Sequence, residues 1–417
     1  MSKPKIRFKG YEEDWEQRKL GDLVDVLDGD RGKNYPTSDD FDISGHTIFL
    51  NASNVTNNGF LFQDNQFITE EKSNNMGNGK LEEDDIVITS RGSLGHIAWY
   101  NADISSLMPY ARINSGMLIL RNKKEIETEY LYHFMKSDKG QSQISFISFG
   151  SAQPQLTKKG VEDLKVILPT RRDEQTQLGH CFSSLDHLIT LHQRKCEETK
   201  KLKKYMLQKM FPQNGKRVPE IRFAGFTDDW EQRKLGDISS LITKGTTPKD
   251  KSGTGEVNFI KVENINDFSG DIVGMSKISL EEHQGYLKRS QLQEGDILFS
   301  IAGTLGRVTS VNKEILPANT NQALSIIRLK EGNLEYVKTC LKGNVVADFI
   351  RRNPTIGAQP NLSLEQVSNL EIEIPSEAEQ EKIGLYFSNL DHLITLHQRK
   401  YEELQKIKKF MLQNMFI

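Results

Sequence analysis

The sequence contains few residues whose type and spacing could support catalysis or hold a metal. His187 and His192 are five residues apart on an expected helix, so they lie on different faces and do not suit a shared metal. Residues 77–80, Gly-Asn-Gly-Lys, lack the spacing and the Ser or Thr of a Walker A phosphate loop. Asp84 and Asp85 precede an expected strand, a position typical of turn residues. We therefore predict no catalytic residue, no metal site and no cofactor bound by this chain.

Other residue types favour recognition over catalysis. Short polar or glycine-containing pieces survive between two otherwise unlike stretches of the chain, and they offer Asn, Gln, Arg and Ser side chains. These side chains commonly contact phosphates and base edges in DNA. For each piece, a purely structural turn is an equally weighted alternative. The matched pieces are residues 51–55 with 261–265, 90–95 with 300–306, and 150–156 with 356–362.

The segments that must position these pieces occur twice, and only their outer parts are alike. Residues 14–22 (DWEQRKLGD) recur unchanged at 229–237, and residues 185–195 (LDHLITLHQRK) recur unchanged at 390–400. A simple duplication would leave the middles as alike as the ends. Identical ends around divergent middles instead indicate two copies of one docking surface that carry two different recognition heads.

We call the two middles head 1 (residues 20–170) and head 2 (residues 235–375). Both contain short runs of β-branched and aromatic residues bounded by Gly, Asn and Asp, as at residues 85–89, and this pattern is typical of strands. Helical stretches are expected at residues 127–136 and 334–351. The pattern predicts an α+β protein with two mixed α/β heads.

Each head is followed by a long helix, expected at about residues 174–210 and 377–415. Apolar residues and histidines alternate at spacings of three and four along both, and Lys203 and Lys408 interrupt this seam at matching places. An imperfect coiled-coil seam predicts two helices packed against each other, whereas the alternative is a charged helix packed only on its own domain. About 35 residues span roughly 50 Å at 1.5 Å per residue, so we expect the helices to act as spacers.

The repeat predicts a chain of four parts. Residues 212–219, which carry prolines at both ends and a glycine between them, are expected to link the two copies. The four parts are a first recognition domain with its opening segment (residues 1–170), a first long helix (171–213), a second recognition domain with its opening segment (214–375) and a second long helix (376–417).

The charge balance does not by itself predict a nucleic-acid-binding protein. The formal net charge is −2. Head 1 contains 14 Lys and Arg against 21 Asp and Glu, head 2 contains 15 against 17, and only residues 171–217 are clearly basic, with 11 against 5. DNA-binding domains are usually basic. If the heads bind DNA, we expect local basic clusters and help from partner proteins.

The sequence also indicates a cellular compartment. No apolar run approaches the roughly 20 residues of a membrane span, and the N-terminus lacks the apolar stretch of a signal peptide. Cys181, Cys196 and Cys340 show neither metal-ligand spacing nor a disulfide framework. We therefore expect a cytoplasmic protein with reduced thiols.

The motifs together resemble those of one known family. The opening segment WEQRKLGD, the Gly-Thr-Leu-Gly loop at 303–306, Asn-Gln-Ala-Leu at 321–324, Gln-Pro-Asn-Leu-Ser at 359–363 and the repeated LDHLITLHQRK helix are similar to the specificity subunit of type I restriction-modification systems. The resemblance covers essentially the whole chain, in the family's usual order.

This resemblance implies a division of labour between subunits. Two target-recognition domains would each read half of a split, asymmetric DNA sequence. The long helices would pack as an antiparallel coiled coil that sets the gap and docks two modification subunits, on surfaces related by a pseudo-two-fold axis. Adenine methylation with S-adenosylmethionine would belong to the modification subunits. Translocation and cleavage of DNA, with ATP and Mg, would belong to separate restriction subunits.

Candidate contact residues follow at the level of loops, because basic side chains on glycine-containing loops can approach phosphates closely. The expected DNA contacts are Arg31, Lys33, Asn34, Asn54, Arg91, Ser93, Arg112 and Gln153 in head 1, and Lys244, Thr246, Thr247, Lys249, Asn264, Thr304, Arg307, Asn321, Gln322 and Gln359 in head 2. The expected partner-docking residues are Leu185, His192 and Arg194 in the first copy, and Leu390, His397 and Arg399 in the second.

Two other functions compete with a non-catalytic DNA-specificity subunit. One is a two-headed adaptor that joins protein partners through the coiled coil and does not bind DNA. The other is a self-contained modification enzyme, which is disfavoured because both middles lack a glycine-rich cofactor loop and an Asn/Asp-Pro-Pro-Tyr/Phe segment. Salt-dependent DNA affinity in the presence of partners would separate the specificity subunit from the adaptor.

Overall fold

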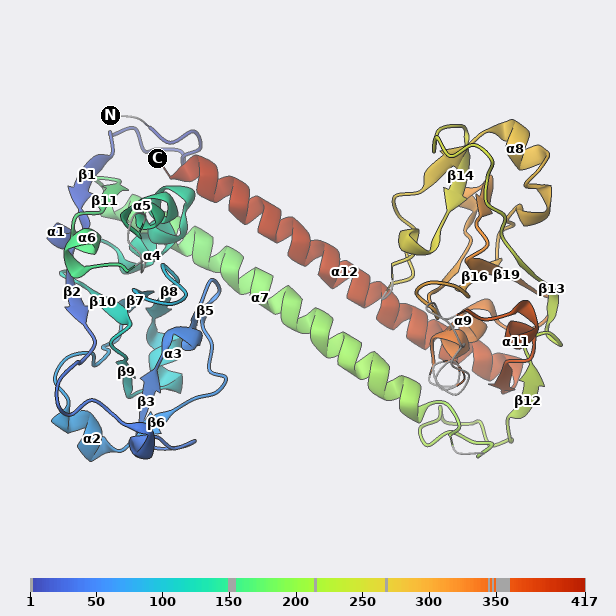
Figure 1. Cartoon of the computed structure of the whole chain (residues 1–417), viewed down its shortest axis with the longest axis horizontal. Helices are drawn as coiled ribbons and strands as arrows, with labels where there is room; N and C mark the ends of the chain where they lie inside the picture. Colours follow the sequence, from blue (N-terminus) through green and yellow to red (C-terminus); the bar gives the residue numbers. More distant parts are fainter. Residues whose placement is uncertain are drawn as a thin grey trace. The chain divides into compact units, whose positions relative to one another are not determined.

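The computed structural model describes residues 3–148, 155–213, 216–266, 269–343, 346, 349 and 361–416 (Figure 1). The chain divides into two compact units, one formed by residues 1–190 with 402–417 and the other by residues 191–401. Unit 1 contains head 1, the beginning of the first long helix and the end of the second. Unit 2 contains head 2, the end of the first long helix and the beginning of the second. The four-part division made from the sequence stays a prediction.

Head 1 is built on two sheets. The larger has the strand order β2 (Val24–Asp28), β10 (Met117–Asn122), β7 (Asp85–Thr89) and β8 (Ile97–Tyr100), and all its neighbours pair antiparallel. The smaller has the order β6 (Phe67–Ile68), β3 (Thr47–Leu50) and β9 (Ala111–Ile113), with β3 and β9 parallel. Every residue of β7 is buried, which explains its nearly continuous β-branched sequence.

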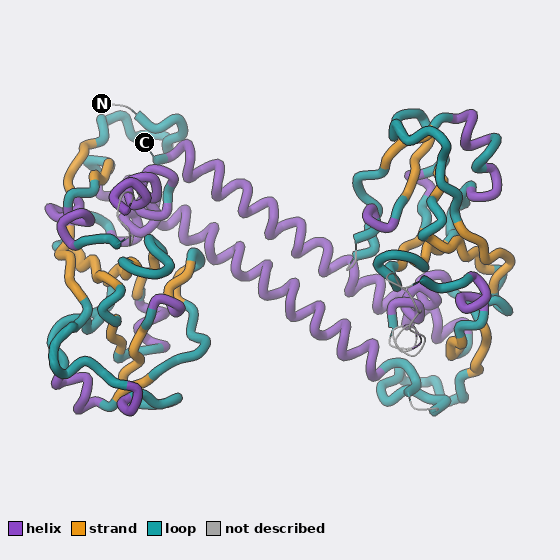
Figure 2. Tube along the Cα trace, in the orientation of Figure 1, coloured by secondary structure: helices purple, strands orange, loops and turns teal. Residues whose placement is uncertain are grey.

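Head 2 repeats this architecture although its sequence differs. Its larger sheet has the order β13 (Ser239–Lys244), β19 (Leu324–Leu329), β16 (Ile297–Ser300) and β17 (Val308–Ser310). Its smaller sheet has the order β15 (Ser276–Ile278), β14 (Val257–Ile260) and β18 (Ala318–Thr320), again with one parallel pair. The predicted α+β class with two mixed heads is therefore confirmed (Figure 2).

In each unit, the strand in the repeated opening segment pairs with the last strand of the head. In unit 1, β1 (Glu16–Lys19) pairs antiparallel with β11 (Lys165–Leu168), and in unit 2, β12 (Glu231–Lys234) pairs in the same way with β20 (Glu371–Ile374). The tryptophan before each first strand is buried. The shorter elements are α1 (Leu20–Leu23), β4 (Val55–Thr56), β5 (Gly59–Phe60), α2 (Glu70–Asn75), α3 (Ala102–Leu107), α4 (Thr128–Lys136), α5 (Asp138–Ser148), α6 (Lys158–Glu162), α8 (Leu280–Gln284), α9 (Leu334–Lys342) and α11 (Leu364–Ser368).

The long helices are α7 (Arg172–Lys209) and α12 (Glu377–Met415), close to the predicted bounds. Within unit 2, His192 contacts His397, the Cys196 thiol faces the carbonyl oxygen of Ile394, and Lys203 pairs with Asp391. Residue numbers rise along one helix as they fall along the other, so the helices are antiparallel. In the part of the chain that the structure describes, no helix is long and apolar enough to cross a bilayer.

Two ion pairs explain why lysines interrupt the apolar seam. Lys203 pairs with Asp391 in unit 2, and Lys408 pairs with Asp186 in unit 1. The two lysine side chains are only 12% and 16% exposed. Asp186 and Asp391 occupy the same position of the repeat, as do Lys203 and Lys408. Each copy therefore gives its lysine to the other copy's aspartate, which is the reciprocity that a pseudo-two-fold arrangement requires.

The end of each long helix completes the core of the other copy's head. Phe416 follows α12, is 4% exposed and lies against Tyr130, Phe134 and Phe182 of unit 1, with ring centroids 5.5, 6.0 and 5.3 Å away. Phe211 follows α7 and packs in the same way against rings of unit 2. Neither head encloses its aromatic core with its own residues alone.

In unit 2, His192 and His397 pack against each other, and this contact affects the protonation of His397. The Nδ1 atoms of His192 and His397 are 3.0 Å apart, so one imidazole must donate and the other must accept. Burial lowers the pKa of His397 below its usual value, and the neighbouring His192 and Lys195 lower it further. Protonation of both rings would remove the acceptor and place two cations in contact.

Replacing Phe416 by Ala should destabilise unit 1 much more than replacing Phe410, which is 57% exposed in the same helix. Loss of a buried Phe from a packed core costs about 3–5 kcal/mol, whereas an exposed substitution usually changes stability by less than about 0.5 kcal/mol. Urea unfolding followed by tryptophan fluorescence measures both effects. Equal destabilisation by F416A and F410A would show that the helix end is not part of the core.

The stability of unit 2 should fall as the pH decreases below about 6.5, the ordinary histidine value. The pKa of His397 is lowered in the folded chain, so the unfolded chain binds more protons in this range and acid favours unfolding. Thermal unfolding between about pH 7.5 and 5.5 should show this slope in wild type and a flatter slope in H397N. The control is H392N, which should keep the wild-type slope, because His392 is exposed and lies in the same unit as the histidine pair. An unchanged slope in H397N would exclude this pair as its source.

Candidate nucleic-acid interface

Loops from three parts of head 1 meet at one place. Gly29 lies so close to Asn114 that a Cβ at position 29 would be 2.1 Å from the Asn114 carbonyl oxygen. The backbone N–H of Arg91 donates to the carbonyl oxygen of Gly116 at 3.2 Å. We call residues 29–34, 90–95 and 113–116 the head 1 loop cluster. Their main chains hold one another in place, so the cluster presents its side chains from a fixed backbone.

Head 2 has an equivalent arrangement. A Cβ at Gly245 would be 2.1 Å from the carbonyl oxygen of Asn321, and the N–H of Ile301 donates to the carbonyl oxygen of Ala323 at 2.9 Å. We call residues 244–249, 301–304 and 320–323 the head 2 loop cluster. The close approach of each glycine to the facing loop aligns Gly245 with Gly29.

The loops that follow β7 and β16 share one backbone shape. Gly92 and Gly303 both have φ of +75°, a conformation that favours glycine. The Thr89 hydroxyl accepts from the N–H of residue 96 at 2.9 Å, and the Ser300 hydroxyl accepts from the N–H of residue 307 at 2.7 Å. The structure thus aligns Ser300 with Thr89, one residue away from the match that the sequence suggested. With this register, Arg91 corresponds to Ala302.

Two predicted DNA contacts, Asn54 and Asn264, are buried and shape their own loops. Asn54 is 1% exposed; its side chain accepts from its own loop at Asn51 N (3.0 Å) and donates to the carbonyl oxygen of Leu61 (3.1 Å). Asn264 makes the same type of bonds, accepting at 2.8 Å and donating at 3.0 and 2.8 Å. The predicted loop correspondence holds, but both amides are occupied by the protein's own main chain.

A third predicted contact, Arg112, is also buried. Its side chain donates to the hydroxyl of Ser73 at 2.9 Å and to the carbonyl oxygens of Gly77 and Asn78 at 3.1 and 3.0 Å. Burial lowers the pKa of its guanidinium. The sequence showed a basic residue in a loop-rich region and gave no signal of burial. The structure assigns Arg112 to holding residues 73–78 in place, and we no longer expect it to contact DNA.

Four other candidates are partly used in hydrogen bonds within head 2, three of them inside its loop cluster. The Asn321 side-chain oxygen accepts from the N–H of Ala323 at 3.2 Å, and the Thr247 hydroxyl bonds to the side chain of Gln322. The Arg307 guanidinium donates to the carbonyl oxygens at positions 262 and 265, each at 3.0 Å. These contacts stiffen the loops, while Thr247 and Gln322 themselves remain exposed.

The remaining predicted contacts lie at the surface or outside the described residues. Gln153 and Gln359 lie outside the described residues. Thr246 is half-buried and its hydroxyl accepts from the side chain of Arg289 at 3.1 Å. The exposed candidates are Arg31, Lys33, Asn34, Arg91 and Ser93 in head 1, and Lys244, Thr247, Lys249, Thr304 and Gln322 in head 2. Ten predicted side chains are thus accessible to a ligand.

Sequence reasoning missed two residues beside the head 2 loop cluster. Arg289 bonds to Thr246, and the Lys249 ammonium lies 4.7 Å above the ring of Tyr286, which is 52% exposed. Both residues lie just after α8, in a part of head 2 without a sequence match in head 1, so the repeat gave no signal for them. An aromatic ring with two cations nearby adds a stacking surface to the cluster.

The predicted docking residues mostly face inward. Leu390 is 6% exposed in the core of unit 2, Leu185 packs against the core of unit 1, and His192 and His397 face each other. Arg194 and Arg399 are exposed, and they pair with Glu198 at 2.7 Å and Asp271 at 3.1 Å, respectively. The repeated sequence therefore marks mainly the helix seam, and the docking role of these residues stays a prediction.

Exposed apolar residues instead form a repeated flank on both long helices. Each of them comes one position before a residue of the seam, so those within one unit lie on the same side of its helix pair. Each of these exposed residues in α7 also has an apolar counterpart in α12 at the same position of the repeat. We call this set the flank patch: Leu188, Leu202 and Tyr205 in α7, at 40, 45 and 49% exposed, and Leu393, Ile407 and Phe410 in α12, at 41, 38 and 57%.

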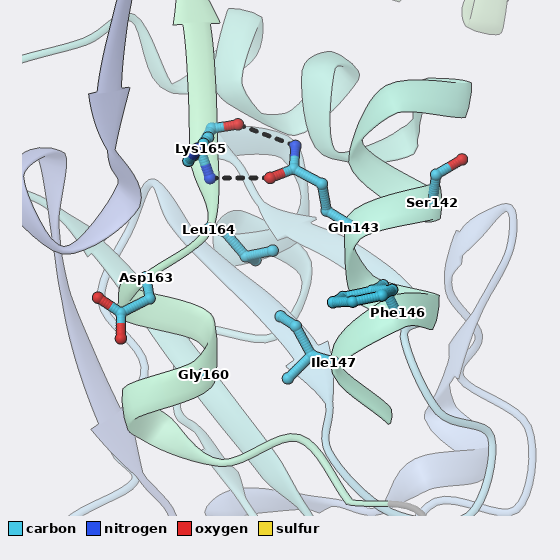
Figure 3. Close-up of a pocket in the computed structure, with 8 residues that line it drawn as sticks. All are labelled: Ser142, Gln143, Phe146, Ile147, Gly160, Asp163, Leu164 and Lys165. Atoms are coloured by element: carbon cyan, nitrogen blue, oxygen red, sulfur yellow. Dashed lines mark hydrogen bonds between the residues drawn. The ribbon is translucent and has the colours of Figure 1, made fainter. Parts of the chain in front are cut away.

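Head 1 also contains a pocket of about 470 Å³ between α5, α6 and β11 (Figure 3). The Gln143 side chain makes two hydrogen bonds of 2.9 Å to the main chain of Lys165, and Phe146 lies at the rim, 83% exposed. Among the described residues that line it, the one carboxylate, Asp163, is paired with Lys19 and Lys159. Across the described ranges, no group of three or more His, Cys, Asp and Glu could hold a metal ion.

Comparison with known proteins identifies the family. A family model described as the type I restriction modification DNA specificity domain matches residues 12–201 and again residues 227–406. The chain is 24% identical over 416 residues to the type I restriction enzyme MjaVIII specificity subunit of Methanocaldococcus jannaschii, which covers 95% of this chain and 91% of the relative. It is 29% identical over 167 residues to the EcoBI specificity subunit of Escherichia coli, covering 37% of this chain and 34% of the relative.

A solved structure shows the same fold. The crystal structure of the S subunit of a type I restriction-modification system from M. genitalium matches with a TM-score of 0.69 at 15% identity, and the match covers 100% of this chain and 99% of that one. The two matches to the family model account for most of the sequence, one for each copy of the repeat. The chain therefore belongs to the type I restriction-modification DNA specificity family and contains two copies of its domain.

Proposed function

We propose that this chain is the sequence-specificity subunit of a type I restriction-modification complex and that each head reads one half of a bipartite, asymmetric DNA target. The observation that carries this proposal is the pair of loop clusters. Both clusters have the same main-chain framework, fixed by Gly29 in head 1 and Gly245 in head 2. Their side chains differ, as the exposed Arg91 and the half-buried Ala302 at the same position illustrate. One framework with two sets of side chains suits two different sequences.

The chemistry of the exposed side chains supports base recognition. Arginine reads guanine through two parallel hydrogen bonds, and Gln, Thr and Ser contact base edges or phosphates. Head 1 presents Arg91 and Ser93 from its cluster, while head 2 presents Thr304 and Gln322. The buried Asn54 and Asn264 hold their own loops rigid through hydrogen bonds to the main chain, which lowers the conformational entropy lost on binding.

The helices are proposed to set the gap between half-sites and to bind two modification subunits through the flank patch. Leu188 and Tyr205 of α7 correspond to Leu393 and Phe410 of α12, so the same apolar surface occurs once in each unit. A partner that recognises one occurrence recognises the other. Exposed apolar residues grouped on one side of a helix pair are typical of protein interaction sites.

The same proposal places the chemistry on other subunits. In it, the chain is not catalytic, the modification subunits bind S-adenosylmethionine and methylate adenine, and restriction subunits use ATP and Mg. The proposal draws on the names of the relatives, which are specificity subunits of type I restriction enzymes. It also fits the acidic balance of both heads, because basic partner surfaces can add phosphate contacts to the few that the heads offer.

The test is the genome-wide pattern of N6-methyladenine in a host that carries the modification partner, with and without this gene. A split motif with a fixed gap should be methylated only when the gene is present, because the partner needs the two heads to locate its site. Absence of any gene-dependent motif, with the partner active alongside another specificity subunit, would favour the two-headed protein adaptor.

Replacing Arg91 by Ala should change only one half of that motif. Loss of a two-bond arginine contact costs about 1–3 kcal/mol of discrimination, so the half read by head 1 should become degenerate at one position. The motif in R91A cells measures this effect. R18A is the matched control, because Arg18 is a partly exposed arginine of unit 1 that pairs with Glu125 outside the loop cluster. A change in both halves, or in neither, would contradict the assignment of Arg91.

Replacing Phe410 by Glu should reduce the number of bound modification subunits from two to one, and adding Tyr205→Glu should abolish binding. A buried, unpaired carboxylate at an apolar interface costs several kcal/mol. Native mass spectrometry of the complex counts the subunits. L385E is the control, because Leu385 is 60% exposed on α12 and does not belong to the flank patch. Two subunits bound to both variants would place the docking surface elsewhere.

A further inference from the structure

Where head 1 meets α7, Arg7 and Glu174 form a buried ion pair with two hydrogen bonds. The Arg7 Nε atom donates to one carboxylate oxygen of Glu174 at 2.7 Å, and its terminal nitrogen donates to the other at 2.8 Å. The Glu174 side chain is only 1% exposed. In unit 2, Arg222 and Glu379 form the same pair with both distances at 2.8 Å. Each arginine lies eight residues before the tryptophan of the repeated opening segment, and each glutamate is the third residue of a long helix.

A buried glutamine adds a second connection at each junction. The Gln175 side chain donates to the carbonyl oxygen of Pro169 at 2.8 Å and accepts from the N–H of Glu127 at 3.0 Å. Glu127 immediately precedes α4 of head 1. In unit 2, Gln380 donates to the carbonyl oxygen at position 375 and accepts from the N–H of Asn333, each at 2.9 Å. One side chain thus ties the start of each long helix to the start of a head helix.

A glycine lets the two helices approach closely at the same junction. A Cβ at Gly179 would be 3.0 Å from the Glu129 side chain, and a Cβ at Gly384 would be 2.8 Å from the backbone nitrogen of Tyr336. α7 therefore crosses α4 at Gly179, and α12 crosses α9 at Gly384. We call the ion pair, the glutamine and the glycine together the joint. Each unit contains one joint built from the same four residue types, Arg, Glu, Gln and Gly.

Stability alone gives a weak reason for this construction. Removing two charges from water is costly, and well-packed apolar residues of similar volume often stabilise as well as a buried ion pair. An arginine–carboxylate pair with two hydrogen bonds also fixes the relative orientation of the two segments that it joins, because its planar geometry admits one relative orientation. A small change in this orientation moves the far end of a head by a large distance. A tilt of about 10° over a domain of roughly 30 Å moves its tip by about 5 Å, more than the roughly 3.4 Å between base pairs.

We infer that the two joints fix the direction in which each head leaves its long helix and thereby restrict the complex to one gap between half-sites. Arg7, Glu174 and Gln175 are the positioning residues of unit 1, and Arg222, Glu379 and Gln380 are those of unit 2. They touch neither bases nor partner in this inference, which rests on the proposed function. The heads would determine which bases are read, and the joints would determine how far apart they are read.

The test measures gap discrimination separately from sequence discrimination. The complete complex of this chain with its modification partner methylates a series of duplexes that contain the same two half-sites at gaps changed by one or two base pairs in either direction. A parallel series keeps the gap and changes one base of a half-site. The variants are E174Q and E379Q, each of which removes one charge at nearly constant volume. R7K and R222K form a second set, which keeps the charge but loses the two-bond geometry.

Each variant should lower the ratio of methylation at the preferred gap to methylation at the next gap by about tenfold, equivalent to roughly 1.4 kcal/mol. Discrimination against a changed base should stay as in wild type. The controls are E125Q and E331Q, which remove exposed carboxylates paired with Arg18 and Arg233 in the same two units. Neither control should alter the gap ratio.

Three results would count against the inference in different ways. A fall in total activity and melting temperature with an unchanged gap ratio, in both sets of variants, would reduce the joints to a structural role. A gap ratio that falls equally in E125Q and E331Q would show that it reports general destabilisation. If wild type methylates no split site in a chain-dependent manner, the proposed function fails, and the inference fails with it.

Discussion

The antiparallel register of the two long helices rests on two partly buried ion pairs, Lys203 with Asp391 and Lys408 with Asp186. A lysine in an apolar seam is costly unless its charge is paired, so a shifted register would leave charges buried without partners. Burial lowers the pKa of Lys203, which shows that this cost is present even in the paired state. Each pair draws one residue from each copy. The register that satisfies both is therefore also the one that carries each helix end into the other copy's head.

The heads separate a fixed framework from a variable surface. Glycines at close approaches, buried asparagines and the Arg112 guanidinium are all occupied in holding main chains together. Most of these contacts are made to main-chain atoms of other loops in the same head, so the side chains of those loops can change without breaking the contacts. Two sequences as unlike as heads 1 and 2 can therefore keep one strand order and differ where a ligand would touch them. Divergence of recognition does not require divergence of fold.

The sequence predicted what periodicity and repetition encode. The α+β class, the long helices, the seam and the matching loops all follow from patterns along the chain. It could not predict burial of single polar side chains, since Asn54 and Arg91 look alike as polar residues in loops. It also missed Arg289, which has no repeated counterpart, and the flank patch, because repeated residues were attributed to docking when most of them form the seam. Burial and side-chain partners depend on contacts between distant segments, which local patterns do not contain.

The acidic balance of the heads has a consequence for how recognition and modification are coupled. Affinity for DNA comes mainly from phosphate contacts by basic residues, whereas discrimination comes from contacts with bases. Head 1 carries 21 acidic against 14 basic residues, so it is poorly equipped to bind DNA tightly on its own. If the partner subunits supply the phosphate contacts, only the assembled complex holds its target. Under the proposed function, a site would then be occupied only when the methylating subunits are present, and the specificity chain alone would not block unmodified sites.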